Sequence, residues 1–228
     1  MSARAKDWDR HVIDGEEVAR TPGFLGLRDE IVRLAAVAPG DVVADVGAGT
    51  GLLALALADD AAKVWALDIS SGMCDYLAAK AESAELTSIR CVVASAVSLP
   101  LVDASVDVVV SNYCFHHVDD DDKRRALAEI QRVLRPGGRL VFGDMMFRVS
   151  VGDPRDREVL AAKVRAMVAK GPAGIWRLTK NGARFAGRRW EHPAPAEWWR
   201  EALERAGFAD VTVSVLPHEG GIASARKG

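Results

Sequence analysis

The sequence has few cysteines, and none of them stands in a metal-binding or redox pattern. Cys74, Cys91 and Cys114 are scattered along the chain and form no Cys-x-x-Cys pair. An odd number of isolated cysteines excludes a disulfide framework and argues against a zinc site made of clustered thiolates. This usage favours a reducing compartment, so we expect a cytoplasmic protein.

Long hydrophobic runs and a strong net charge are also lacking. The longest apolar run, residues 52–58, is far shorter than the roughly 20 residues that a membrane-spanning helix needs. The first 20 residues are rich in Arg, Asp and Glu and contain no apolar signal core. The formal net charge is only −2, which gives no overall attraction to nucleic acid or anionic membrane. We therefore expect no membrane insertion.

Short β-branched runs alternate with helical stretches, which is the pattern of a parallel α/β sheet with helices on both faces. Hydrophobic residues make up 49% of the 228 positions, enough for the core of one domain. We expect strands at residues 41–46, 63–68, 89–94, 105–111, 138–144, 210–216 and 221–226. Expected helices are residues 52–58, 72–84, 122–134 and 195–206, and Arg135-Pro136-Gly137-Gly138 predicts a helix stop followed by a turn.

A glycine-rich turn follows the first expected strand. Gly47, Gly49 and Gly51 are spaced by two, and Asp45 precedes them at the end of the strand. Glycines allow a sharp turn and a close approach of a ligand to the backbone. Dinucleotide sites use Gly-x-Gly-x-x-Gly to seat a pyrophosphate, whereas a carboxylate here suits a cationic amino or sulfonium ligand. The pattern therefore argues against NAD.

Asp68 ends the second expected strand, 23 positions after Asp45. A carboxylate at that place is positioned to accept hydrogen bonds from both hydroxyls of a ribose. The alternative is that Asp68 caps the next helix, a role that Ser70 or Ser71 could also fill.

Taken together, these and later motifs resemble the class I methyltransferases that depend on S-adenosylmethionine (SAM). Within that class the chain is similar to the small-molecule group that includes the ubiquinone and menaquinone biosynthesis methyltransferases. The resemblance covers roughly residues 37–215. It rests on Asp45-Val46-Gly47-Ala48-Gly49-Thr50-Gly51, Ala66-Leu67-Asp68-Ile69-Ser70, Leu99-Pro100, Ser105-Val106-Asp107-Val108-Val109-Val110-Ser111, Phe115-His116-His117-Val118, Arg132-Val133-Leu134-Arg135-Pro136-Gly137-Gly138-Arg139-Leu140 and Ala206-Gly207-Phe208.

The resemblance implies a Rossmann-like, mostly parallel seven-stranded sheet with an antiparallel last strand. It implies that SAM binds and that S-adenosylhomocysteine is the product. The cofactor residues that it implies are Asp45, Gly47, Gly49, Gly51, Asp68, Ile69, Ser95, Ala96 and Asn112. Relatives usually carry Gly-Asp-Ala at the adenine, whereas this chain has Ala94-Ser95-Ala96, so the contact there is expected to be weaker or made by the backbone.

The same resemblance divides the single domain, residues 1–228, into four parts. Residues 1–36 are expected to form an N-terminal helical lid, although Trp8 and Phe24 could pack on a second subunit instead. Residues 37–144 would form the SAM-binding core. Residues 145–194 would form a basic insertion that acts as a helical substrate lid, and residues 195–228 the C-terminal helix and strands.

Three residues are candidates for catalysis: His116, His192 and Asp144. Methyl transfer from a sulfonium needs mainly alignment of the reacting atoms, but a phenol, amine or carbon acid can also need a general base. His116 is the first candidate for the base and His192 the second, while Asp144 ends the fifth strand, where it could contact substrate. A structural role stays open, because the paired histidine is a signature of the family across different chemistries.

The acidic run from Asp119 to Asp122 could suggest a magnesium site. It directly precedes Lys123-Arg124-Arg125, and an acidic start to a helix is explained by capping and by the helix dipole. We therefore expect no metal.

The stretch from residue 145 to 190 carries eleven Lys and Arg against three Asp and Glu, a net charge of +8. We expect these residues to cover a small-molecule substrate, anionic or aromatic. RNA methylation through this stretch is an alternative. DNA is not expected, because the chain has neither the Asn/Asp-Pro-Pro-aromatic motif nor a Pro-Cys pair. A non-catalytic protein that binds SAM or a partner is the remaining alternative.

Overall fold

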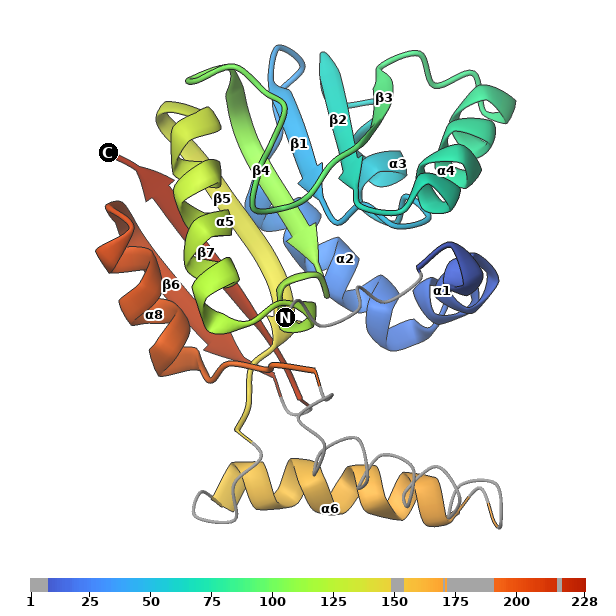
Figure 1. Ribbon diagram of the computed structural model, residues 1–228, viewed down its shortest axis with the longest axis vertical. Coiled ribbons are helices and arrows are strands. Elements are labelled where there is room, and N and C mark those ends of the chain that lie inside the picture. The colour runs from blue at the N-terminus through green and yellow to red at the C-terminus, as the bar shows by residue number, and fades with distance from the viewer. Residues whose placement is uncertain (1–7, 149–153, 170, 172–190, 217–218) are drawn as a thin grey trace, which may run out of the picture.

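The computed structural model describes residues 8–148, 154–169, 171, 191–216 and 219–228. Their strands form one seven-stranded sheet with the order β3-β2-β1-β4-β5-β7-β6 (Figure 1). In chain order the strands are β1 (Val42–Val46), β2 (Lys63–Asp68), β3 (Ile89–Val93), β4 (Val106–Asn112), β5 (Leu134–Met145), β6 (Phe208–Val215) and β7 (Gly220–Lys227).

The strand directions agree with the fold expected from the sequence. The strands from β3 to β5 pair in parallel, and β7 runs antiparallel to both β5 and β6. The prediction of a mostly parallel sheet with an antiparallel last strand is therefore confirmed. Most strand ends lie within two residues of the expected positions.

The turn at residues 135–138 was expected to separate the helix from the next strand, and this expectation is wrong. The strand β5 starts at Leu134, directly after the helix, and Leu134 already pairs with Val106. The next pair joins Val108 to Arg139, so two steps along β4 correspond to five along β5. The additional residues bulge out of the sheet, and Gly137 there has a φ of 76°, which glycine adopts without strain. Pairing with β4 thus begins before the glycines.

Helices cover both faces of the sheet, as Figure 1 shows. In the described part of the chain they are η1 (Trp8–His11), α1 (Val12–Ala19), α2 (Pro22–Ala35), α3 (Ala54–Leu57), α4 (Ser71–Ser83), η2 (Phe115–His117), α5 (Asp120–Val133), α6 (Pro154–Val168) and α8 (Ala196–Arg205). The expected helix 52–58 is shorter because the Asp45 carboxylate accepts a hydrogen bond from the Ala54 amide at 3.0 Å, which places the helix start there.

Two hydrophobic cores lie on opposite faces of the sheet. Alternate residues of β1 divide between them: Ala44 and Val46 pack in the core that contains Trp199 of α8, and Val43 packs in the core that contains Ile31 of α2. This alternation follows from the two-residue period of a strand, and burial on both faces explains why the strands read as apolar runs. None of the helices in the described ranges is long and apolar enough to cross a membrane.

The helix α6 lies within the expected basic insertion, and in Figure 1 it lies beyond the end of the sheet. Arg155 of α6 donates hydrogen bonds to the carbonyls of Met146 and Gly220, at 2.8 and 3.3 Å. Residues 172–190, which carry many of the basic side chains of the insertion, lie outside the described residues.

The start of α5 provides a test of the capping interpretation. Asp119 Oδ1 accepts a hydrogen bond from the Asp122 amide at 2.9 Å, so replacing Asp119 with Ala should lower the free energy of unfolding by about 1 kcal/mol. The control is Asp121→Ala, which removes an exposed carboxylate that pairs with the half-exposed Arg124 and should cost less than about 0.5 kcal/mol. Equal losses in urea unfolding would contradict the capping role.

Candidate active site

Polar side chains meet at the carboxyl ends of four neighbouring strands. Asp45 lies near the end of β1, Asp68 ends β2, Asn112 ends β4 and Asp144 lies near the end of β5. In an open α/β sheet this edge is where ligands bind. All four residues are among those expected at the site from the sequence.

The loop after β1 needs its glycines for two different reasons. Gly47, Gly49 and Gly51 all have positive φ, at 74°, 52° and 95°, which side chains adopt only with strain. A Cβ at Gly47 would also collide with the sulfur of Cys114, whereas the space above Gly49 is open. The contact with Cys114 could not be predicted, because Gly47 follows β1 and Cys114 follows β4, far apart in the sequence.

The carboxylate of Asp45 is completely buried. Burial raises its pKa to about 7, against the lowering effect of the hydrogen bond from the Ala54 amide, and the negative charge of Asp68 raises it further. A buried carboxylic acid with a pKa near neutrality is poised to ionise when a cation arrives.

Asp68 lies in contact with the glycine loop. Its Oδ2 accepts a hydrogen bond from the Gly49 amide at 2.8 Å, and its Oδ1 accepts one from the Ser70 amide at 2.9 Å. Burial raises the pKa of Asp68 despite these bonds. The helix cap is Ser70, whose Oγ accepts from the Met73 amide at 3.0 Å, so Asp68 is not needed for capping.

These side chains fit the cofactor that the resemblance implies. Among the described residues no lysine or arginine forms an ion pair with Asp45 or Asp68, so the buried Asp45 and the partly buried Asp68 have no cationic partner there. Asn112 Oδ1 is buried and has no hydrogen-bond partner among the described residues. A ligand with an ammonium group and a sulfonium would supply both the missing charge and a donor.

The residues expected at the adenine lie beside Asp68. The strands β2 and β3 pair Asp68 with Val93, and the Ala94 amide donates to the Asp68 carbonyl at 2.8 Å. Ile69 is 56% exposed, which leaves its side chain available to an apolar ring. Ser95 Oγ lies 3.4 Å from the Val97 amide. The contacts of Ile69, Ser95 and Ala96 with adenine stay predictions.

His116 and Asp144 form a buried pair. His116 Nδ1 lies 2.6 Å from Asp144 Oδ1, while Asp144 Oδ2 accepts hydrogen bonds from the amides of Phe115 and His116 at 2.7 and 3.2 Å. The Met145 amide also donates to Oδ1, at 2.6 Å. Asp144 therefore orients the imidazole and the short helix η2, and the contact with substrate that was considered for Asp144 stays a prediction.

His192 reaches the site through its backbone. The His192 amide donates a hydrogen bond to the His116 carbonyl at 2.7 Å, and His192 as a whole is exposed. This places His192 beside η2, and it gives the His192 ring no geometry comparable with that of the His116–Asp144 pair.

The N-terminal helices lie against this edge of the sheet. The ring of Trp8 lies 4.5 Å from that of His117, and Phe24 stacks on Tyr113 at 4.6 Å. Asp9 accepts hydrogen bonds from Ser70 Oγ at 2.5 Å and from the Gly72 amide at 3.0 Å. The contact of Asp9 with the loop after β2 was not predicted, because Asp9 lies in a stretch of many charged residues and no local pattern distinguishes it.

Tyr113 has a strained backbone at the centre of these contacts. Its φ is 52°, a conformation that costs energy for a residue with a side chain and that is common at functional sites. Its ring also meets the His116 ring edge-on at 5.8 Å, and burial raises the pKa of its hydroxyl. Tyr113 thus links the N-terminal helices to the imidazole.

A second contact fixes the N-terminal helices to the glycine loop. Lys80 of α4 donates to Glu16 Oε2 of α1 at 2.9 Å and to the Thr50 carbonyl at 3.1 Å. The loop is therefore held from both sides, by Lys80 and by Asp68.

Several known proteins that are similar to this chain in sequence or fold are methyltransferases. The family model described as "Methyltransferase domain" matches residues 44–142. An uncharacterized methyltransferase of Geobacillus kaustophilus is 31% identical over 169 residues, which cover 73% of this chain and 72% of the relative. A malonyl-[acyl-carrier protein] O-methyltransferase of Methylococcus capsulatus is 44% identical over 100 residues, 43% of this chain and 35% of that protein. The crystal structure of a SAM-dependent methyltransferase from Aquifex aeolicus superposes with a TM-score of 0.66 and 19% identity, over 95% of this chain and 98% of that one.

The role of Asp68 can be tested by binding. Replacing Asp68 with Ala should weaken SAM binding by roughly 1.5–3 kcal/mol, the scale of lost hydrogen bonds to a charged group. Asp75→Ala, which removes an exposed carboxylate on α4, should leave the affinity unchanged. Unaltered SAM affinity in a folded Asp68 variant, measured by calorimetry, would remove Asp68 from the site.

The raised pKa of Asp45 predicts a pH dependence of SAM binding. A bound cation favours the ionised carboxylate and lowers its pKa from about 7, so binding should release a proton and the affinity should rise between about pH 6 and 7.5. Calorimetry in buffers of different ionisation enthalpy measures this release. It should disappear in Asp45→Asn, and a release that persists in that variant would assign the proton to another group.

Proposed function

The chain belongs to the SAM-dependent class I methyltransferases, and from this premise we propose that it methylates a small molecule whose nucleophilic atom carries a proton. The bound cofactor supplies a methyl group on a sulfonium, whose sulfur is a good leaving group. The chain must then bind the cofactor, align the acceptor and receive the proton.

We assign cofactor binding to the edge formed by β1, β2 and β4. Asp68 would accept hydrogen bonds from the ribose, and Gly47, Gly49 and Gly51 would let the cofactor lie against the backbone. Asp45 and Asn112 Oδ1 would face its cationic part. The observation that supports this assignment is the pair formed by the buried Asp45 and the partly buried Asp68, two carboxylates that have no cationic partner in the described chain.

A small acceptor is supported by the cover over this edge. The Trp8 ring contacts the His117 ring, and the Phe24 ring stacks on the Tyr113 ring. Asp9 fixes the N-terminal segment to the loop after β2. A site that is covered by aromatic side chains of its own chain suits a molecule small enough to be enclosed. We propose that residues 8–35 act as the lid, and that the insertion completes it.

We assign the proton to His116. Because Nδ1 of His116 faces the Asp144 carboxylate at 2.6 Å, the proton sits on Nδ1 and the lone pair on Nε2. Asp144 in turn is held by three backbone amides. An imidazole that is fixed in this tautomer is suited to accept a proton from an acceptor hydroxyl or amine.

The relatives support methyl transfer and not one acceptor. The malonyl-[acyl-carrier protein] O-methyltransferase acts, by its name, on a malonyl group carried by an acyl-carrier protein, and the matched part is 35% of its length. We therefore take from it the donor half of the reaction. Small acids, phenols and quinols are the acceptors to try first, because the basic insertion favours anionic or aromatic molecules.

Replacing His116 with Ala should reduce turnover by about 10²–10⁴ while SAM binding is retained. His192→Asn is the matched control and should retain most of the activity, since the hydrogen bond between His192 and His116 is made by the His192 backbone amide, which the substitution keeps. Release of S-adenosylhomocysteine measures both. Full activity in the His116 variant would exclude it as the base, and a larger loss in the His192 variant would transfer the assignment.

The acceptor class is tested by offering small acids, phenols and quinols in parallel with RNA. We expect S-adenosylhomocysteine to form with a small molecule. Turnover with RNA alone, together with salt-sensitive RNA retention, would replace this proposal by RNA methylation through the insertion.

A further inference from the structure

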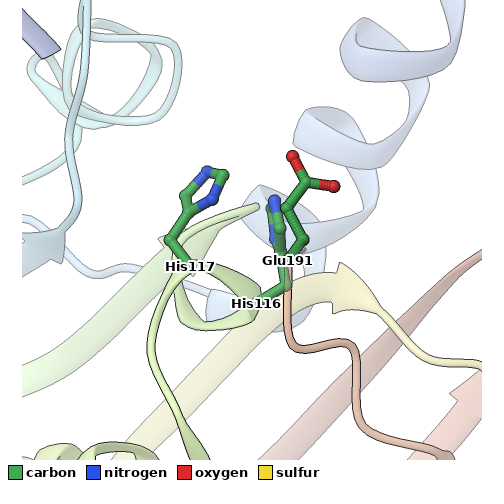
Figure 2. A group of neighbouring side chains, drawn as sticks. All are labelled: His116, His117 and Glu191. Carbon is green, nitrogen blue, oxygen red and sulfur yellow. The ribbon is translucent and has the colours of Figure 1, made fainter. Parts of the chain in front are cut away.

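A cluster of three metal-ligating side chains lies beside the proposed proton acceptor. The side chains of His116, His117 and Glu191 each place one possible ligand atom so that all three atoms lie within 4.8 Å of one another. Figure 2 shows the two histidines projecting from η2 and Glu191 approaching from the segment that leads into α8. A general base at His116 needs neither the His117 imidazole nor the Glu191 carboxylate, so the proposed base does not explain why the three side chains lie together.

The most buried member of the cluster is already oriented as a metal ligand would be. Nδ1 of His116 is taken by Asp144, so Nε2 is the nitrogen that faces away from the carboxylate. Histidines that bind metals commonly donate their other ring N–H to a carboxylate, which fixes the tautomer and makes the ligating nitrogen more basic. Asp144 is completely buried and hydrogen-bonded to backbone amides, so this orientation is rigid.

The donor set indicates which ions would bind. Two imidazoles and one carboxylate suit a divalent transition metal, and the same set holds Zn²⁺ in sites that keep a fourth position open. Ligand atoms on one zinc ion lie roughly 3.4 Å apart, given bonds of about 2.0–2.1 Å in a tetrahedral arrangement. Closing from the observed separation requires small rotations, for which the terminal torsion of Glu191 is soft.

We infer that His116, His117 and Glu191 form a binding site for a divalent transition-metal ion, with Zn²⁺ as the best fit, at the entrance to the acceptor site. The inference goes beyond the proposed function, since metal binding is a property of the protein without any acceptor. The ion uses the Nε2 lone pair of His116. A bound ion and a transferred proton therefore exclude each other, and zinc should inhibit methyl transfer reversibly.

The expectation of no metal concerned a different set of residues, the acidic run that starts at Asp119. There the carboxylates act in capping and surface ion pairs. The ligands inferred here come from segments 75 positions apart, so no local spacing in the sequence indicates a metal site.

Binding can be measured without any methyl acceptor by titrating the full chain with Zn²⁺ against a colorimetric chelator. Losing a group that only orients a ligand weakens metal binding about 10–100-fold, so Glu191→Gln and His117→Asn should each weaken it by at least about tenfold. Glu204→Gln, on the exposed face of α8, and Cys91→Ser should bind zinc like the unmodified protein, and circular dichroism should show that all four variants are folded.

The outcomes separate this inference from the proposed function. Absence of zinc binding would overturn the metal site. So would Glu191 and His117 variants that bind zinc as tightly as the unmodified protein, or a Cys91 variant that no longer binds it. Saturating zinc should stop methyl transfer and a chelator should restore it; transfer that continues with zinc bound would overturn the competition at His116. A protein that binds zinc through these residues and methylates no small molecule would refute the proposed function alone.

Discussion

The buried carboxylate of Asp144 is the constraint on which the arrangement of the site depends. It lies near the end of β5, a central strand, and it joins that strand to η2 through the amides of Phe115 and His116 and through the His116 ring. Because a buried carboxylate must satisfy its lone pairs internally, the turn after β4 is held in one conformation. The strained backbone of Tyr113 lies within that turn and is stabilised by it. The positions of His116, His117 and Tyr113 therefore follow from one side chain.

At the ends of β1 and β2, two carboxylates have no cationic partner among the described residues. Asp45 is buried and the nearby Asp68 is partly buried, and burial raises the pKa of both. A protein that needed only stability would place apolar residues there. A cationic ligand makes these carboxylates favourable, and the glycine loop brings its backbone close enough for the ligand to reach them. The same two carboxylates explain why a pyrophosphate is a poor fit to a loop that otherwise looks like a dinucleotide site.

The fold could be predicted because its signals are local. Apolar runs such as those around Val43 and Val108 mark strands covered on both faces. The spacing from Gly47 to Gly51, with Asp45 and Asp68, indicates where the cofactor is proposed to bind. What could not be predicted depends on contacts between distant segments. The packing of Cys114 under Gly47, the hydrogen bonds of Asp9, and the approach of Glu191 to the paired histidines leave no pattern in the sequence. The early start of β5 was missed because Pro136 and its two glycines signal a turn, whereas pairing with β4 already holds Leu134.

The central claim is that this edge of the sheet binds an adenosyl ligand with a cationic tail. Its most direct test is a calorimetric titration of the purified protein with SAM, with S-adenosylhomocysteine and with NAD. Saturable binding of both adenosyl ligands and no binding of NAD is the result that the account predicts. Binding of NAD, or no binding of either adenosyl ligand, would contradict it.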